Sequence, residues 1–97
     1  MNLDEYRTFL RNGELPSGLS PPLEALWHDG RGSWETAHER VQSDNGTDAA
    51  WVHAYLHRKE GDLGNADYWY RRAGRTRPEA GLEEEWESIV VSLLDQL

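Results

Sequence analysis

The feature that most constrains the fold of this chain is an internal repeat in its middle. Shifted by 29 residues, the sequence matches itself: Ala25, His28, Gly32, Trp34, Ala37 and Val41 fall on Ala54, His57, Gly61, Leu63, Ala66 and Tyr70. Each copy has the pattern of two helices joined by a glycine-containing turn. One such hairpin cannot bury its apolar face alone and gains stability by stacking on its neighbour. The repeat therefore predicts two stacked helical hairpins.

Caps and breaks divide the chain into helical segments. Asn2 and Glu5 have the spacing of a capping box, and Gly13 is a stop signal. Ser20, Ser33 and Thr47 each precede an apolar periodic stretch as N-cap candidates. We predict helices over residues 3–11, 21–29, 34–42, 48–59, 63–74 and 80–96, and nothing alternates with the period of a strand. The expected architecture is all-α and single-domain, with an N-terminal helix (1–13), a linker (14–20), repeat 1 (21–44), repeat 2 (47–78) and a longer C-terminal helix (79–97) that caps the repeats.

Composition limits how such a chain is stabilised and where it resides. With 97 residues and no cysteine, a single domain must form its core from apolar and aromatic side chains, without disulfides or thiolate metal sites. No apolar run approaches the ~20 residues that a membrane span needs. The N-terminal stretch also lacks the basic and apolar regions of a secretion signal. We therefore expect a cytoplasmic protein that does not enter membranes.

The charge balance argues against nucleic-acid binding. The formal net charge is −8, and an acidic surface repels phosphate backbones. One basic cluster lies at the end of a predicted helix and consists of Arg71, Arg72, Arg75 and Arg77. We interpret it as a complement to the helix C-terminus that pairs with the acidic run at residues 83–85.

The second repeat unit resembles a known family. The pattern Gly61-x-Leu63-x-x-Ala66-x-x-x-Tyr70-x-x-Ala73-x-x-x-x-Pro78 is similar to the second half of a tetratricopeptide repeat, and Ala66-x-x-Trp69-Tyr70-x-Arg72-Ala73 resembles the related Sel-type repeat. The likeness covers roughly residues 21–78. The first unit departs from the pattern at Val41 and Asp44, and polar residues replace large apolar ones at Glu24 and His53.

The resemblance implies a binding role rather than catalysis. Tetratricopeptide repeats bind proteins or peptides, although one fold serves many tasks. Residues 26–29 and 51–57 also resemble a small bacterial family of hypothetical proteins, and that likeness implies no activity. Interfaces use aromatic anchors, so we take a group of aromatic residues as partner-binding candidates, with membership of the core as the alternative: Trp27, Trp34, Trp51, Tyr55 and Trp69. The C-terminal helix offers a second alternative, pairing with another copy of the chain as a homodimer.

The sharpest chemical feature is a set of histidines and a carboxylate. Glu24 and His28, and likewise His53 and His57, are spaced i, i+4, so that both members of each pair face the same way. His38 on the intervening helix is an addition to this group. Such a cluster is compatible with a buried hydrogen-bonded network, with a small polar-ligand pocket, or with a divalent metal site.

No catalytic residue or cofactor is expected from the sequence. The metalloprotease pattern His-Glu-x-x-His and a nucleophile-elbow serine do not occur. The sequence therefore favours a non-enzymatic interaction module that binds a protein or peptide. The alternative function is a small-ligand or divalent-metal-binding protein that uses the histidine and glutamate cluster.

Overall fold

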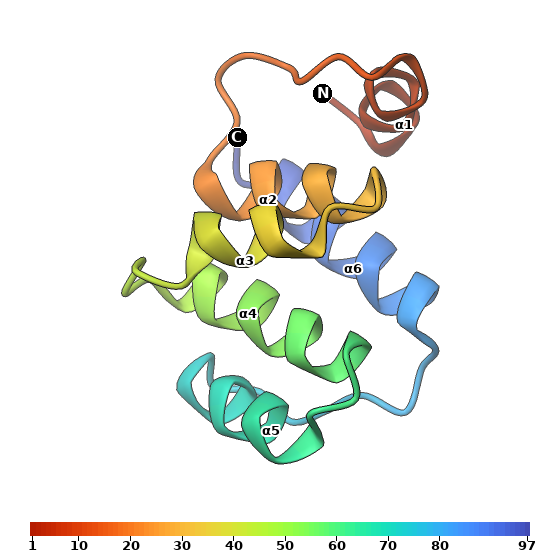
Figure 1. Ribbon diagram of the computed structural model, residues 1–97. Coiled ribbons are helices and arrows are strands. Elements are labelled where there is room, and N and C mark those ends of the chain that lie inside the picture. Colours follow the sequence, from red (N-terminus) through yellow and green to blue (C-terminus); the bar gives the residue numbers. More distant parts are fainter.

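The computed structural model describes all 97 residues and contains six α-helices and no strand (Figure 1). The helices are α1 (Leu3–Asn12), α2 (Pro21–Gly30), α3 (Trp34–Val41), α4 (Thr47–Lys59), α5 (Leu63–Arg72) and α6 (Leu82–Leu94). This confirms the all-α prediction, and each predicted helix is present with its ends shifted by at most a few residues. None of the six combines the length and the apolar character that crossing a bilayer requires.

Helices α2 and α3 form one hairpin and α4 and α5 a second (Figure 1). The two turns are built alike. In each turn a glycine adopts a left-handed conformation, Gly32 with φ 84° and Gly61 with φ 89°. The residue after each glycine donates its backbone N–H to a histidine carbonyl at 2.9 Å, Ser33 to His28 and Asp62 to His57. The 29-residue sequence period therefore reappears as a period in backbone hydrogen bonds.

The hairpins pack closely because small residues line their inner faces. Ala25, Ala37, Ala54 and Ala66, the repeated alanines, are fully buried. A methyl side chain at these positions lets two helix backbones approach one another. Between the hairpins, α4 packs against both α2 and α3, so it is the central helix of the molecule.

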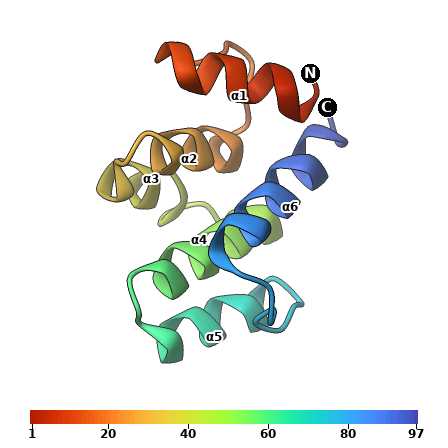
Figure 2. The same cartoon turned by 90° about the vertical axis from the view of Figure 1, so that its right-hand side faces the viewer.

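The C-terminal helix does not continue the stack beyond α5. It turns back and packs on α2 and α4, on the side away from α3 (Figure 2). Its apolar stripe, made of Trp86, Ile89, Val90, Leu93 and Leu94, is buried in the core. The stripe on which the homodimer expectation rested is therefore engaged within the chain.

The N-terminal helix is held by its one buried residue, Tyr6. The Tyr6 hydroxyl donates to the Leu23 carbonyl at 2.7 Å, and its ring packs against Trp86 at 5.9 Å between centroids. The Trp86 indole N–H in turn donates to the Leu26 carbonyl at 3.0 Å. Two aromatic side chains with polar tips thus attach α1 and α6 to the backbone of α2.

Two local predictions need correction. The N-cap of α4 is Gly46 rather than Thr47, and the Asp44 side chain in the preceding turn accepts from the Gly46 N–H at 2.8 Å. The arginines after α5 also do not pair with the acidic run at 83–85. Arg77 pairs with Asp67 at 3.3 Å, and the Arg75 guanidinium lies 3.3 Å from the centre of the Trp51 ring. The predicted capping box is present, with Asn2 and Glu5 exchanging hydrogen bonds.

Candidate functional site

Three of the four histidines converge where α3 meets α4. His38 extends from α3, and His53 and His57 lie one turn apart on α4. The Nε2 atoms of His38 and His53 are 3.0 Å apart, and one nitrogen from each of the three rings lies within 4.8 Å of the others. We call these three residues the histidine trio. His53 and His57 are buried and His38 is half-buried, so the trio lies just beneath the surface.

Two tryptophans enclose the histidine trio. The Trp34 ring stacks on His38 with centroids 5.0 Å apart and planes within 8°. On the other side the Trp69 ring stacks on His53 at 4.0 Å and 17°. The Trp34 indole N–H also donates to the Leu56 carbonyl at 2.8 Å, which fixes α3 on α4. The imidazoles are therefore held between rings that restrict their rotation.

Polar neighbours define the orientation of His57. Its Nδ1 lies 2.6 Å from a carboxylate oxygen of Glu60, and its Nε2 lies 3.3 Å from the Asn65 side-chain amide nitrogen. A carboxylate accepts only, so the His57 proton resides on Nδ1 and Nε2 carries a lone pair. Glu60, the C-cap residue of the same helix, thus fixes the His57 ring in a single tautomer.

The surroundings keep two members of the trio neutral. Burial, reinforced by the nearby His57 and His38 rings, lowers the pKa of His53 to about 4. Burial and His57 also lower the pKa of His38, against the opposing effect of Glu60 and Glu39. A neutral imidazole is both a hydrogen-bond partner and a metal ligand. At neutral pH these two rings are therefore available in the form that accepts a proton or a cation.

Two residues of the sequence-predicted cluster lie outside the trio. Glu24 faces Arg40 at 3.4 Å, and the His28 ring packs edge-on against Trp27 at 5.1 Å. The Nε2 of His28 is buried without a hydrogen-bond partner. Burial and the Arg40 charge lower the pKa of His28, against the opposing effect of Glu24. The structure thus brings together His53, His57 and His38, with Glu60 rather than Glu24 as the adjacent carboxylate.

The predicted partner-binding aromatics divide into two groups. Trp27, Trp51 and Tyr55 are buried members of the core. Trp34 and Trp69 are half-buried and pack against the core from outside. Tyr68, which is 45% exposed, lies edge-on to Trp69 at 5.3 Å. The rings that reach the surface are therefore those that flank the histidine trio.

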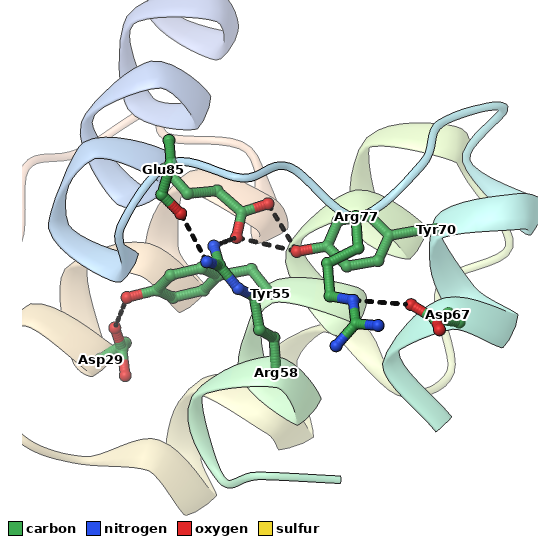
Figure 3. Close-up of polar contacts among 8 residues, drawn as sticks. Asp29, Tyr55, Arg58, Asp67, Tyr70, Arg77 and Glu85 are labelled. Atoms are coloured by element: carbon green, nitrogen blue, oxygen red, sulfur yellow. Dashed lines mark hydrogen bonds and ion pairs between the residues drawn. The ribbon is translucent and has the colours of Figure 1, made fainter. Parts of the chain in front are cut away.

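A second buried polar cluster connects α4, α5 and α6 (Figure 3). The Tyr70 hydroxyl lies 2.6 and 2.8 Å from the two carboxylate oxygens of Glu85, and Arg58 pairs with the same carboxylate at 2.8 Å. Arg58 also donates to the Ala80 carbonyl. Burial and the hydrogen bond to Glu85 raise the pKa of Tyr70. Each charged group in this cluster is satisfied, as expected of a structural ion pair.

A third polar group lies at the far end of α2. Asp29, which is buried, accepts from the Tyr55 hydroxyl at 3.2 Å and from Lys59 at 2.9 Å. These residues line part of a cavity of about 440 Å³ between α1, α2, α4 and α6. None of the five surface cavities is lined by a histidine. The histidine trio therefore lies outside these five cavities.

Comparison with protein-family models, with curated proteins and with solved structures gives no match to this chain.

The sequence reasoning missed the central position of His38 and the partners Glu60 and Asn65. Glu60 follows His57 by three residues, one helical turn, so a carboxylate at that spacing was a usable signal. Asn65 comes from the next helix, and only the packing of α5 on α4 brings it close to His57. Nothing in the linear pattern indicates such a contact.

Proposed function

We propose that this chain is a non-enzymatic interaction module of the helical-repeat type, which binds a basic segment of another protein. The proposal includes the finer architecture: two stacked tetratricopeptide-like hairpins with accessory helices at both ends of the chain. Its support is the 29-residue period, the two turns with the same hydrogen bonds, and the fully buried repeated alanines.

The proposed docking surface is the aromatic face, which we define as Trp34, His38, Tyr68 and Trp69. These four side chains are half-buried or exposed, and they lie on α3 and α5. Through the buried His53 ring they form one continuous series of contacts, with successive centroids 4.0 to 5.3 Å apart. Helix α6 already covers the side of α2 and α4 that lies opposite the aromatic face. We therefore assign the docking area to the aromatic face and not to the side that α6 covers.

Charge complementarity specifies a basic partner. The net charge is −8, and many cationic side chains are already engaged within the chain, as in the pairs Arg7–Glu87, Arg40–Glu24 and Arg77–Asp67. The acidic side chains of Glu39, Glu60 and Asp62 remain exposed beside the trio. Arg72 stacks over Trp69 at 4.9 Å, and a partner's cationic side chain would make the same kind of contact by displacing it. A partner's arginine or lysine side chains would find both rings and carboxylates here.

Site-specific photo-cross-linking tests this proposal. A photoreactive phenylalanine derivative replaces Tyr68, which is 45% exposed on the aromatic face, and in a matched control it replaces Val91, which is 38% exposed on α6. We expect the Tyr68 position, in the cells that produce the protein, to capture a basic segment that the Val91 position does not capture. The affinity of that segment, made as a peptide, should fall with rising salt.

Other outcomes contradict the proposal. Cross-links from Val91 to a second copy of this chain would indicate a homodimer through α6. A captured segment that binds equally well at low and high salt would refute the argument from charge. Failure of both positions to capture any protein while the chain is folded would refute the interaction role.

A further inference from the structure

The histidine trio has the dimensions of a metal site. A tetrahedral zinc ion holds imidazole nitrogens at about 2.0–2.1 Å, which places two such nitrogens about 3.3 Å apart. The Nε2 atoms of His38 and His53 are 3.0 Å apart, and one nitrogen from each of the three rings lies within 4.8 Å of the other two. Small rotations of the rings would therefore bring three nitrogens to bonding distance around one ion.

The proton arrangement leaves a lone pair on two of the three nitrogens that would hold an ion, and the third ring must move its proton to Nδ1 on binding. The carboxylate of Glu60 holds a proton on Nδ1 of His57, so His57 Nε2 carries a lone pair, which an ion would take over from the Asn65 amide at 3.3 Å. In the contact between His38 and His53, one Nε2 donates and the other accepts, so one of the two is also unprotonated. In metal sites, histidine ligands are oriented in the same way, by donating the far ring N–H to a carboxylate.

The trio is only partly hydrogen-bonded. His53 is 3% exposed, and its Nδ1 has no hydrogen-bond partner. When His53 Nε2 is a ligand, the imidazole proton is on Nδ1, so an ion leaves that N–H as it is. The spacing of the ligand nitrogens, and not this unpaired atom, therefore favours an ion.

We propose that His38, His53 and His57 bind a divalent transition-metal ion of the zinc type, with Glu60 as the carboxylate that orients His57. Three imidazoles suit zinc, cobalt or nickel rather than magnesium or calcium, which take oxygen ligands. Glu39, Glu60 and Asp62 add negative charge around the site, which favours a cation. Because His38 is half-buried, solvent reaches the trio and supplies a water molecule as the fourth ligand.

The ion would connect the two hairpins. His38 belongs to the first hairpin, whereas His53 and His57 belong to the second. An ion that binds only the folded state stabilises that state. The gain grows with the ratio of the free ion concentration to the dissociation constant. His38 also belongs to the proposed docking surface, but metal binding can be tested without any partner.

The test uses the full chain without a histidine tag, after removal of metal with a chelator. Zinc is titrated by calorimetry, and Co²⁺ is added to record the visible absorption bands of tetrahedral cobalt. We expect one ion per chain. Zinc at a hundred times its dissociation constant should raise the melting temperature by on the order of 10 °C.

Three variants locate the ion. His38→Ala removes a half-buried ligand and should abolish the tetrahedral cobalt spectrum. Glu60→Gln should lower the affinity for zinc about 10- to 100-fold. His28→Ala, the matched control, removes the histidine outside the trio and should leave zinc affinity unchanged. Circular dichroism of each variant confirms that it is folded.

The same experiment tests a competing location for the ion. His57, Glu60 and Asp62 also bring ligand atoms within 4.8 Å of one another. Asp62→Asn retains a good N-cap for α5 and removes that carboxylate. Zinc binding lost in Asp62→Asn but kept in His38→Ala would overturn the proposal, and so would equal zinc affinity in His38→Ala and the unaltered protein.

Discussion

Replacing Arg58 by methionine should destabilise the protein far more than a typical ion-pair deletion. The Glu85 side chain is 3% exposed and the Arg58 side chain 14%, so removal of the guanidinium leaves a buried carboxylate without its countercharge. Breaking a buried pair in this way costs about 3–5 kcal/mol. A domain of this size loses roughly 4–8 °C in melting temperature for each kcal/mol. We therefore expect Arg58→Met to lower the melting temperature by on the order of 20 °C.

A second substitution separates charge from packing. In the double variant Arg58→Met, Glu85→Gln the side chain at position 85 is neutral, and its amide oxygen still accepts from the Tyr70 hydroxyl. The double variant should therefore be more stable than Arg58→Met alone, by about 1–3 kcal/mol. Urea unfolding followed by circular dichroism gives both free energies of unfolding.

The exposed pair in the same region serves as the control. Arg77 and Asp67 are 3.3 Å apart, with side chains 37% and 38% exposed (Figure 3). Arg77→Met should cost less than about 1 kcal/mol, because water solvates both charges. The reasoning is refuted if Arg58→Met costs no more than Arg77→Met, or if the double variant is no more stable than Arg58→Met.

Two further predictions concern a turn and a histidine. Gly61→Ala should destabilise the protein by about 1 kcal/mol, because φ at this glycine is 89°. Gly64→Ala, where an added Cβ meets no atom within 4 Å, should be neutral or stabilise the protein by up to about 1 kcal/mol. Urea midpoints measure both changes, and equal effects would contradict this expectation. The lowered pKa of His28 means that the folded state favours its neutral form, so its contribution is complete above its ordinary pKa of 6.5 and is lost as pH falls below that value. Unfolding at pH 7 and pH 5 should accordingly show a smaller loss of stability in His28→Ala than in the unaltered protein, and an equal loss in both would refute it.

The helices were predictable because their signals are local. The capping box at Asn2 and Glu5, the turn glycines Gly32 and Gly61, and the apolar spacing of the last helix each act within a few residues. The internal repeat added the pairing of the helices, since equal sequences are expected to form equal hairpins. These features needed no knowledge of the rest of the chain.

The candidate site was less predictable because equivalent positions in the two repeats have different neighbours. His28 and His57 occupy the same place in the repeat, but only His57 has a preceding hairpin, which supplies His38. His28 belongs to the first hairpin and meets Trp27 and Arg40 instead. An i, i+4 spacing fixes which residues share a helix face, and it cannot specify which side chain of another helix that face meets.

The buried carboxylate was missed for a related reason. Glu85 stands in a run of three glutamates that is typical of a solvated helix start, yet it lies one turn before the buried Ile89. Because α6 turns back over α4 rather than extending the stack, this turn of the helix faces Arg58 and Tyr70. The direction of α6 depends on tertiary packing, and the local sequence does not encode it.

The two buried polar clusters differ in a way that bears on function. Both lie on α4, which is buried over nine consecutive residues, and directional polar contacts there fix how this helix is rotated between its neighbours. The cluster of Arg58, Tyr70 and Glu85 is complete, since none of its atoms is buried without a partner. The histidine trio has an unpaired nitrogen on His53 and a single open side at His38. The closed cluster has no ring nitrogen available to an ion, because its oxygen and guanidinium atoms already bond one another. The trio differs in that three ring nitrogens converge within 4.8 Å beside that open side, and this convergence is what an ion would use.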